Sequence, residues 1–156
     1  MTATNWIAGD GVGLTWTAAF GTEFTTTTVA SGSSIASSVV ITNGTALDVF
    51  CDFSIHLASL AATGAPYVGV YLYPLNQDAS TYGDGRFGTA AAGTPPSNYA
   101  VGNIGMVAAT QAQNGSIIGI VIPPGSFKFV LFNGTNVTTA SSGNTSGYRT
   151  YNISLT

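Results

Sequence analysis

The chain has 156 residues, of which only 6% are charged, and a formal net charge of −3. Soluble domains usually contain about 25% charged residues, so threonine, serine, asparagine and glycine provide most of the polar surface. With three lysines and arginines in total, the chain lacks the clustered basic patch that nucleic acid requires, and no apolar run approaches the ~20 residues that span a bilayer.

Taken in chain order, segments in which apolar and polar residues alternate predict strands at residues 13–19, 24–30, 35–42, 46–58, 66–74, 104–110, 116–122, 126–133, 136–140 and 147–155. Turn formers separate them, among them Asn114-Gly115 and Pro123-Pro124-Gly125, and we expect the second to close a hairpin. Helical periodicity is nearly absent. We therefore predict an all-β fold with one domain over residues 1–156, a two-sheet sandwich of jelly-roll type, with an immunoglobulin-like sandwich as the alternative. The pattern leaves open whether residues 1–20 form an extended arm.

Residues 47–57, LDVFCDFSIHL, show the clearest alternation. The odd positions are all apolar and are expected to face the core, with Cys51 as a buried thiol rather than a nucleophile. The even positions include Asp52, Ser54 and His56, the residue types of a hydrolytic triad. Alternate residues of a strand lie about 6.6–6.8 Å apart, too far for the hydrogen bonds that link a nucleophile, a base and an orienting acid. We interpret this row as the solvated outer face of a strand and expect no catalytic residues.

Three segments of the predicted strands, residues 67–73, 116–122 and 127–132, are apolar on both faces. Strands of this kind are covered twice, and one facing sheet supplies only one cover. In 116–122, strict alternation assigns the even-numbered isoleucines to the core face and Ile117 and Val121 to the outer face. The outer faces of the other two strands carry Tyr71, Tyr73 and Phe132.

Residues 74–103 form the longest segment without a period. Such a segment is uncommon in a compact domain, and its aromatic residues Tyr82, Phe87 and Tyr99 argue against plain disorder. We expect this surface loop to pack on something. Two candidates remain for what covers the outer apolar faces. One is another subunit, which we favour because large apolar patches mark association surfaces, and the other is this loop of the same chain.

The charged residues of the loop are few. Arg86 is expected to pair with Asp84 or with a carboxylate of a neighbouring subunit. Asp78 and Asp84 carry the oxygen ligands that calcium prefers, but their spacing matches no calcium-binding pattern. We therefore expect no metal and no cofactor.

Two motifs, YGDGRFG at residues 82–88 and PPGSFKF at residues 123–129, carry a resemblance to a known class of proteins. Together with the low charge and the Gly/Ala/Thr-rich strands, they resemble the head decoration, or cement, proteins of tailed bacteriophages. The resemblance implies a jelly-roll or related β-sandwich, made in the host cytoplasm, that forms homotrimers on the capsid exterior and binds the major capsid protein. It implies no catalytic residues.

The leading hypothesis is therefore a virion structural protein that decorates a capsid and stabilises the head through buried contact area. The alternative is a glycan-binding, lectin-like module of a tail fibre or receptor-binding protein, with Trp6, Trp16, Tyr82 and Tyr99 as candidates for stacking on sugars. A hydrolase on a sandwich fold is a third and weaker alternative, because one histidine, one cysteine and six acids build few constellations. The residues expected to contact a sister subunit or the capsid are Tyr71, Tyr73, Tyr82, Arg86, Phe87, Tyr99, Ile117, Val121 and Phe132.

Overall fold

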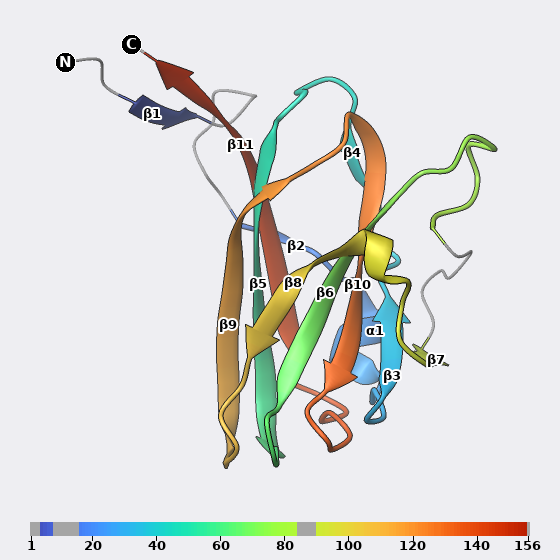
Figure 1. The fold of residues 1–156 in the computed structure, drawn as a ribbon, viewed down its shortest axis with the longest axis vertical. Helices are drawn as coiled ribbons and strands as arrows, with labels where there is room; N and C mark the ends of the chain where they lie inside the picture. Colours follow the sequence, from blue (N-terminus) through green and yellow to red (C-terminus); the bar gives the residue numbers. More distant parts are fainter. Residues whose placement is uncertain (1–3, 8–15, 84–89, 156) are drawn as a thin grey trace.

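The computed structural model describes residues 4–7, 16–83 and 90–155, and nearly all of its regular structure is β-strand in two antiparallel sheets packed face to face (Figure 1). The β5 sheet holds, in spatial order, β1 (Thr4–Ile7), β11 (Thr145–Leu155), β5 (Phe50–Ala61) and β9 (Thr110–Val121), with β2 (Thr17–Ala18) also paired to β11. The β10 sheet holds β7 (Ala90–Ala92), β3 (Ser33–Ala36), β10 (Gly125–Gly134), β6 (Tyr67–Pro74) and β8 (Ala100–Gly105), with β4 (Ile41–Asn43) also paired to β10. The described ranges also contain the short helices α1 (Thr22–Thr26) and η1 (Ser97–Tyr99), and no helix within them is long and apolar enough to cross a membrane.

The strands pair in the order of a jelly roll. In chain order, the eight strand positions are β1, β3 with β4, β5, β6, β8, β9, β10 and β11. The first pairs with the eighth, the second with the seventh, the third with the sixth and the fourth with the fifth, while β5–β11 and β6–β10 pairs join these into two sheets. Nested antiparallel pairing of this kind is what rolling up one long hairpin produces. The prediction of an all-β, two-sheet sandwich is confirmed.

The strand predicted over residues 24–30 is wrong, because a helical turn and extended chain occupy this segment. Phe24 of α1 is buried beside Phe20, with ring centroids 5.3 Å apart. The Glu23 carboxylate accepts hydrogen bonds from the backbone N–H groups of Gly21 and Ser38. These contacts fix α1 against the sandwich, and a strand would not make them. Residues 136–140 are likewise not a strand.

The hairpin predicted at Pro123-Pro124-Gly125 is also wrong. This segment carries the chain from β9 in one sheet to β10 in the other, because most successive strands of a jelly roll belong to opposite sheets. Asn114-Gly115, predicted as a turn, lies inside β9, and residues 106–109 make the connection instead. Glycine is required at position 115 because a Cβ there would collide with Cγ2 of Ile104 on β8.

The core between the sheets is built from the inward rows of β5, β6 and β10. On β5, the odd positions of residues 51–57 are buried as predicted, and the ring of Phe53 lies 4.7 Å from that of Phe129 on β10. Leu47 and Val49 are exposed, contrary to the prediction, because β5 begins only after Val49. The alternation of apolar residues therefore begins before the strand does.

A bulge in β9 decides which of its side chains face the core. Two residues of β9, Ile118 and Gly119, lie opposite a single residue of β5, Asp52. Gly119 has φ +71°, which glycine adopts without strain. The extra residue reverses the alternation, so the assignment of Ile118 to the core and Ile117 to the outer face is wrong. The inward row of β9 is Gln113, Ile117 and Ile120, and the outward row is Asn114, Ser116, Ile118 and Val121.

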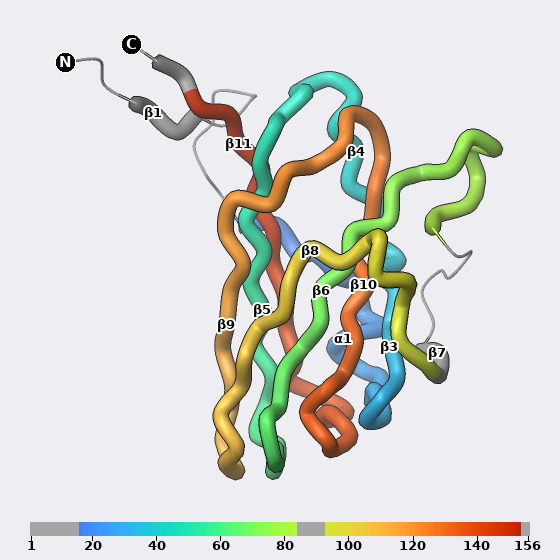
Figure 2. The backbone as a smooth tube through the Cα atoms, viewed as in Figure 1, coloured from blue at the N-terminus to red at the C-terminus, as the bar shows by residue number. Residues whose placement is uncertain are grey.

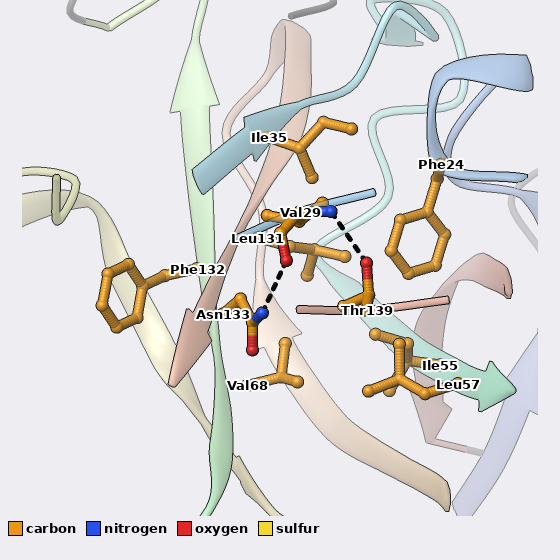
Figure 3. A pocket seen from close by; sticks show the side chains of 10 residues that line it. All are labelled: Phe24, Val29, Ile35, Ile55, Leu57, Val68, Leu131, Phe132, Asn133 and Thr139. Carbon is orange, nitrogen blue, oxygen red and sulfur yellow. Dashed lines mark hydrogen bonds between the residues drawn. The ribbon is translucent and has the colours of Figure 1, made fainter. Parts of the chain in front are cut away.

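Figure 3 shows the side chains that line a small void at the end of the core beside α1. A void of only about 10 Å³ remains among side chains that include Phe24, Leu57 and Leu131, which is room for about one water molecule. Both backbone polar groups of Val29, which lies here, have hydrogen-bond partners. The N–H donates to Thr139 Oγ1 at 2.8 Å, and the carbonyl accepts from Asn133 Nδ2 at 2.8 Å. This part of the interior holds no ligand-sized cavity.

Replacing Gly115 by alanine is expected to lower the free energy of unfolding by about 1–3 kcal/mol, because the added methyl group overlaps Ile104 in a packed region. Urea denaturation followed by circular dichroism measures the change. The matched control is Gly105→Ala on the neighbouring strand β8, where a Cβ meets no atom within 4 Å and a change within about 0.5 kcal/mol is expected. Equal losses for the two variants would contradict the close approach of Ile104 to β9.

Candidate interaction face

The outer face of the β10 sheet is covered by the chain's own loop. Four residues predicted to contact a partner, Tyr71, Tyr73, Tyr82 and Phe132, are buried here. They form a second apolar cluster outside the main core, with Leu75 and Tyr99 packed against it. The alternative in which Tyr71, Tyr73 and Phe132 lie under the loop of the same chain therefore describes these three residues, and Tyr82 is the part of the loop that packs on them.

Aromatic contacts hold the loop on this face. The fully buried Lys128 of β10 places its Nζ 5.0 Å from the centre of the Tyr82 ring, a cation–π geometry. The rings of Tyr73 and Tyr99 lie 4.7 Å apart. Gly83 leaves room for the Tyr73 ring, with which a Cβ at this position would collide. The loop thus acts as a third layer over β6 and β10.

The charged residues of the loop are described only in part. Arg86 and Phe87, both predicted contacts, and Asp84 lie outside the described residues. Asp78 accepts hydrogen bonds from the hydroxyl and N–H of Thr81 and from the N–H of Ser80, which lower the pKa of its carboxyl to about 2. Its oxygens therefore stabilise a turn. Within the described ranges, no three His, Cys, Asp or Glu side chains form a metal-binding group.

The outer face of the β5 sheet is exposed at its β9 edge. Ile118 and Val121 of β9 are 77% and 69% exposed. β9 is the edge of its sheet and lies beside β8, the edge of the other sheet (Figure 2). An open groove of about 420 Å³ lies beside the end of β9, and Tyr99 and Val121 both line it. We call Ile118, Val121 and Tyr99 the β9 strip.

The structure thus brings together two of the predicted contact residues, Tyr99 and Val121, and adds Ile118, which the prediction placed in the core. Ile117 is half-buried and packs towards Gly102 of β8. The sequence contained a signal that Ile117 and Ile118 exchange faces, because a glycine inside a strand pattern, here Gly119, often marks a bulge.

Asp52 lies at the centre of the same face and joins three strands. Its Oδ1 accepts hydrogen bonds from the N–H of Gly119 at 3.0 Å and from the hydroxyl of Tyr151 at 2.9 Å. Its Oδ2 accepts from Nε and Nη2 of Arg149 at 2.9 and 2.8 Å. The Asp52 side chain is only 5% exposed, so this buried charge is compensated by four hydrogen bonds, as buried charges require. The prediction of a solvated face missed this ion pair, because Asp52 and Arg149 are far apart in the sequence.

The surroundings of Asp52 change the ionisation of two neighbours. Burial raises the pKa of the Tyr151 phenol to about 12, and the hydrogen bond to Asp52 adds to the shift. Burial also raises the pKa of the Cys51 thiol to about 12. Cys51 is therefore the inert, buried thiol predicted from the sequence, since the thiolate is the reactive form.

His56 does not form a catalytic constellation with the neighbouring residues of β5. Its Nδ1 lies 2.7 Å from Oδ1 of Asn114 on β9, whereas the Asp52 carboxylate is engaged by Gly119, Tyr151 and Arg149. Serine, histidine and aspartate on this strand are therefore not linked in series, which agrees with the spacing argument from the sequence.

Comparisons with known proteins add little to this geometry. No protein-family model and no curated protein matches the chain. Matches among solved structures include infectious bursal disease virus of the Gx strain, with a TM-score of 0.18 and 12% identity, and the T13 particle of that virus, with a TM-score of 0.15 and 11% identity. Each alignment covers 99% of this chain and 40% of the viral chain. TM-scores this low do not establish a shared fold.

Replacing Asp52 by alanine is expected to lower the free energy of unfolding by about 3 kcal/mol, because it leaves Arg149 without its partner and the bulge at Gly119 without its acceptor. Tyr151→Phe removes the hydrogen bond to Asp52 and is expected to cost about 1 kcal/mol. Chemical denaturation at pH 7 measures both. A loss for Asp52→Ala no larger than that for Tyr151→Phe would contradict the central role of the carboxylate.

Stability is expected to fall between about pH 9 and pH 12. The unfolded chain releases the protons of Cys51 and Tyr151 near their ordinary pKa values of 9.0 and 10.0, whereas the folded chain holds both to about pH 12. Over this window the folded state binds more protons, so the free energy of unfolding decreases as pH rises. Urea denaturation at several pH values measures the slope, which should be shallower in Cys51→Ala with Tyr151→Phe. An unchanged slope in that double variant would rule out these two groups as its source.

Proposed function

We propose that this chain is a virion structural protein, a capsid decoration or cement protein that stabilises a phage head by adhesion and without catalysis. Its partners would be further copies of itself, as a homotrimer, and the major capsid protein. The observation that carries the proposal is the exposed β9 strip, since Ile118 and Val121 are large apolar side chains that expose most of their surface.

The composition supports an adhesive role for this strip. With 6% charged residues in the whole chain, little electrostatic repulsion opposes contact between copies. Exposed apolar surface next to an aromatic residue such as Tyr99 is typical of the core of an association surface. Within the β9 strip, a partner would bury Ile118 and Val121 fully and the half-buried Tyr99 in part.

The edge of β9 supports contact between strands as well. Edge strands usually avoid pairing with other chains by carrying charged residues or proline. The twelve residues of β9 include neither. The ladder between β5 and β9 shifts register at Ile118 and Gly119 and again between Leu57 and Leu60. Residues 113–117 of β9, between the two shifts, lie at the sheet edge and offer it to a strand of another copy.

The outer face of the β10 sheet is covered and is not part of the proposed contact surface. Tyr71, Tyr73, Tyr82 and Phe132 are packed within the chain, so the proposed contacts depend on β9 and its neighbours rather than on the tyrosines. The roles of Arg86 and Phe87 remain predictions.

Changing Ile118 and Val121 together to aspartate is expected to raise the dissociation constant for self-association at least about tenfold, which corresponds to about 1.4 kcal/mol. The reason is that two charges would have to be buried in an apolar contact. Sedimentation velocity at micromolar concentration measures this, with a trimer expected for the wild-type chain. The control is Val107→Asp, an equally simple change of an exposed valine outside the β9 strip.

Mass spectrometry of purified particles of the phage that encodes the chain provides the second test, with the protein expected among their structural components. A wild-type chain that is monomeric at micromolar concentration and absent from those particles would contradict the proposed function.

A further inference from the structure

The part of the β5 sheet on the other side of Asp52 from Val121 is polar and hollowed. Three strands supply two cross-strand rows of outward residues, and an open hollow of about 410 Å³ lies over them. The rows are Ser116, Ser54 and Gly147, and Asn114, His56 and Thr145. Neighbouring strands are about 4.8 Å apart and successive rows about 6.8 Å apart, so the floor measures about 10 Å by 7 Å, the size of one or two sugar rings.

Trp16 lies beside Gly147, one of the residues that line this hollow. A Cβ on Gly147 would lie 3.2 Å from Cε3 of Trp16, so the glycine lets the indole approach β11 closely. The guanidinium carbon of Arg149 lies 4.8 Å from the centre of the Trp16 ring. Trp16 nevertheless remains 47% exposed. An indole held by its neighbours, with nearly half of its surface open to solvent, is a platform for a flat ligand.

The floor of the hollow offers hydrogen bonds that the described part of the chain does not use. None of the hydrogen bonds found among the described residues involves the hydroxyls of Ser54, Ser116 or Thr145. His56 Nδ1 donates to Asn114 Oδ1 at 2.7 Å, because an amide oxygen only accepts. The Nδ2 group of Asn114 and Nε2 of a neutral His56 are thereby left as a donor and an acceptor. Three hydroxyls, one amide and one imidazole thus converge on one open space.

The uncharged lining of the hollow restricts the class of ligand that it can bind. No carboxylate, ammonium or guanidinium group is among the described residues that line it, and Arg149, beside Trp16, is paired with Asp52 at 2.8 Å. Phosphate, sulfate and uronic acids would find no free opposite charge, and a purely apolar ligand would leave the hydroxyls without partners. A pyranose combines an apolar C–H face with a ring of hydroxyls, which matches an indole beside a polar floor.

We propose that this hollow binds uncharged carbohydrate, with Trp16 stacking on a sugar ring and Ser54, His56 and Ser116 hydrogen-bonding to sugar hydroxyls. The site goes beyond the adhesive function and lies on a different part of the face. The other aromatic residues considered for stacking do not compete, since Tyr82 is buried and Tyr99 is half-buried against Tyr73, and nothing is described of the Trp6 side chain.

The first experiment exposes the full chain to an array of neutral, sialylated and uronic-acid-containing glycans. Binding to neutral glycans is expected. The best-bound neutral oligosaccharide is then titrated against the Trp6→Phe variant, in which Trp16 is the sole tryptophan. A saturable change of tryptophan emission is expected, because the sugar would displace water from the indole.

Variants of the full chain test the roles of the residues. Trp16→Ala and His56→Ala are each expected to weaken binding about tenfold, the loss of one good contact, and Trp16→Phe to retain most of it. The control is Val121→Ser, which lies in the β9 strip and should bind sugar as the wild-type chain does while it associates less. The two proposals can therefore fail separately.

The proposal is overturned if no glycan binds above background, if only acidic glycans bind, or if binding is the same in folded Trp16→Ala as in the wild-type chain. Circular dichroism and thermal unfolding establish whether Trp16→Ala is folded. Should it not fold, the emission change in the Trp6→Phe chain and the loss in His56→Ala decide, and the absence of both overturns the site.

Discussion

The carboxylate of Asp52 sets the arrangement of the β5 sheet. By accepting the N–H of Gly119, it stabilises the bulge at which β9 gains a residue, and the bulge decides that Ile118 lies outside and Ile117 inside. The same carboxylate binds Arg149 on the other neighbouring strand. Because its charge is buried and fully hydrogen-bonded, neither partner can move away without a large cost in free energy. The exposure of Ile118 on the outer face follows from this bulge.

The two sheets solve the problem of excess apolar surface in different ways. A chain with so few charges has more apolar side chains than the space between two sheets can hold. On the β10 sheet, the surplus lies beneath the loop, where Tyr82 covers Lys128 and Tyr99 packs on Tyr73. On the β5 sheet, Ile118 and Val121 remain exposed. Of the surplus that sequence analysis assigned to three strands, the part that stays exposed includes Ile118 and Val121 along the edge of β9.

The exposed face of the β5 sheet has two parts with different chemistry. Towards Val121 it is apolar and borders the free edge of β9, which suits contact with another protein surface. Towards His56 it is polar and hollow, with Trp16 beside Gly147 of its lining, which suits a small hydroxyl-rich ligand. Asp52 and Arg149 lie between the two parts, so a protein contact on one and a sugar on the other would not compete for the same side chains.

Local sequence determined the class of fold and most of the core. Alternation with period two and the near absence of helical periodicity were sufficient for an all-β sandwich, and the same alternation identified Cys51 and Phe53 as core residues, because burial of alternate side chains is a local property of a strand. The tertiary structure alone decided which strands pair, that the loop covers the tyrosines, and that the bulge exposes Ile118. It also decided that Trp16 stands beside a hollow made by three other strands. These features depend on contacts between residues far apart in the chain, and no pattern within a single segment encodes which distant segment will lie against it.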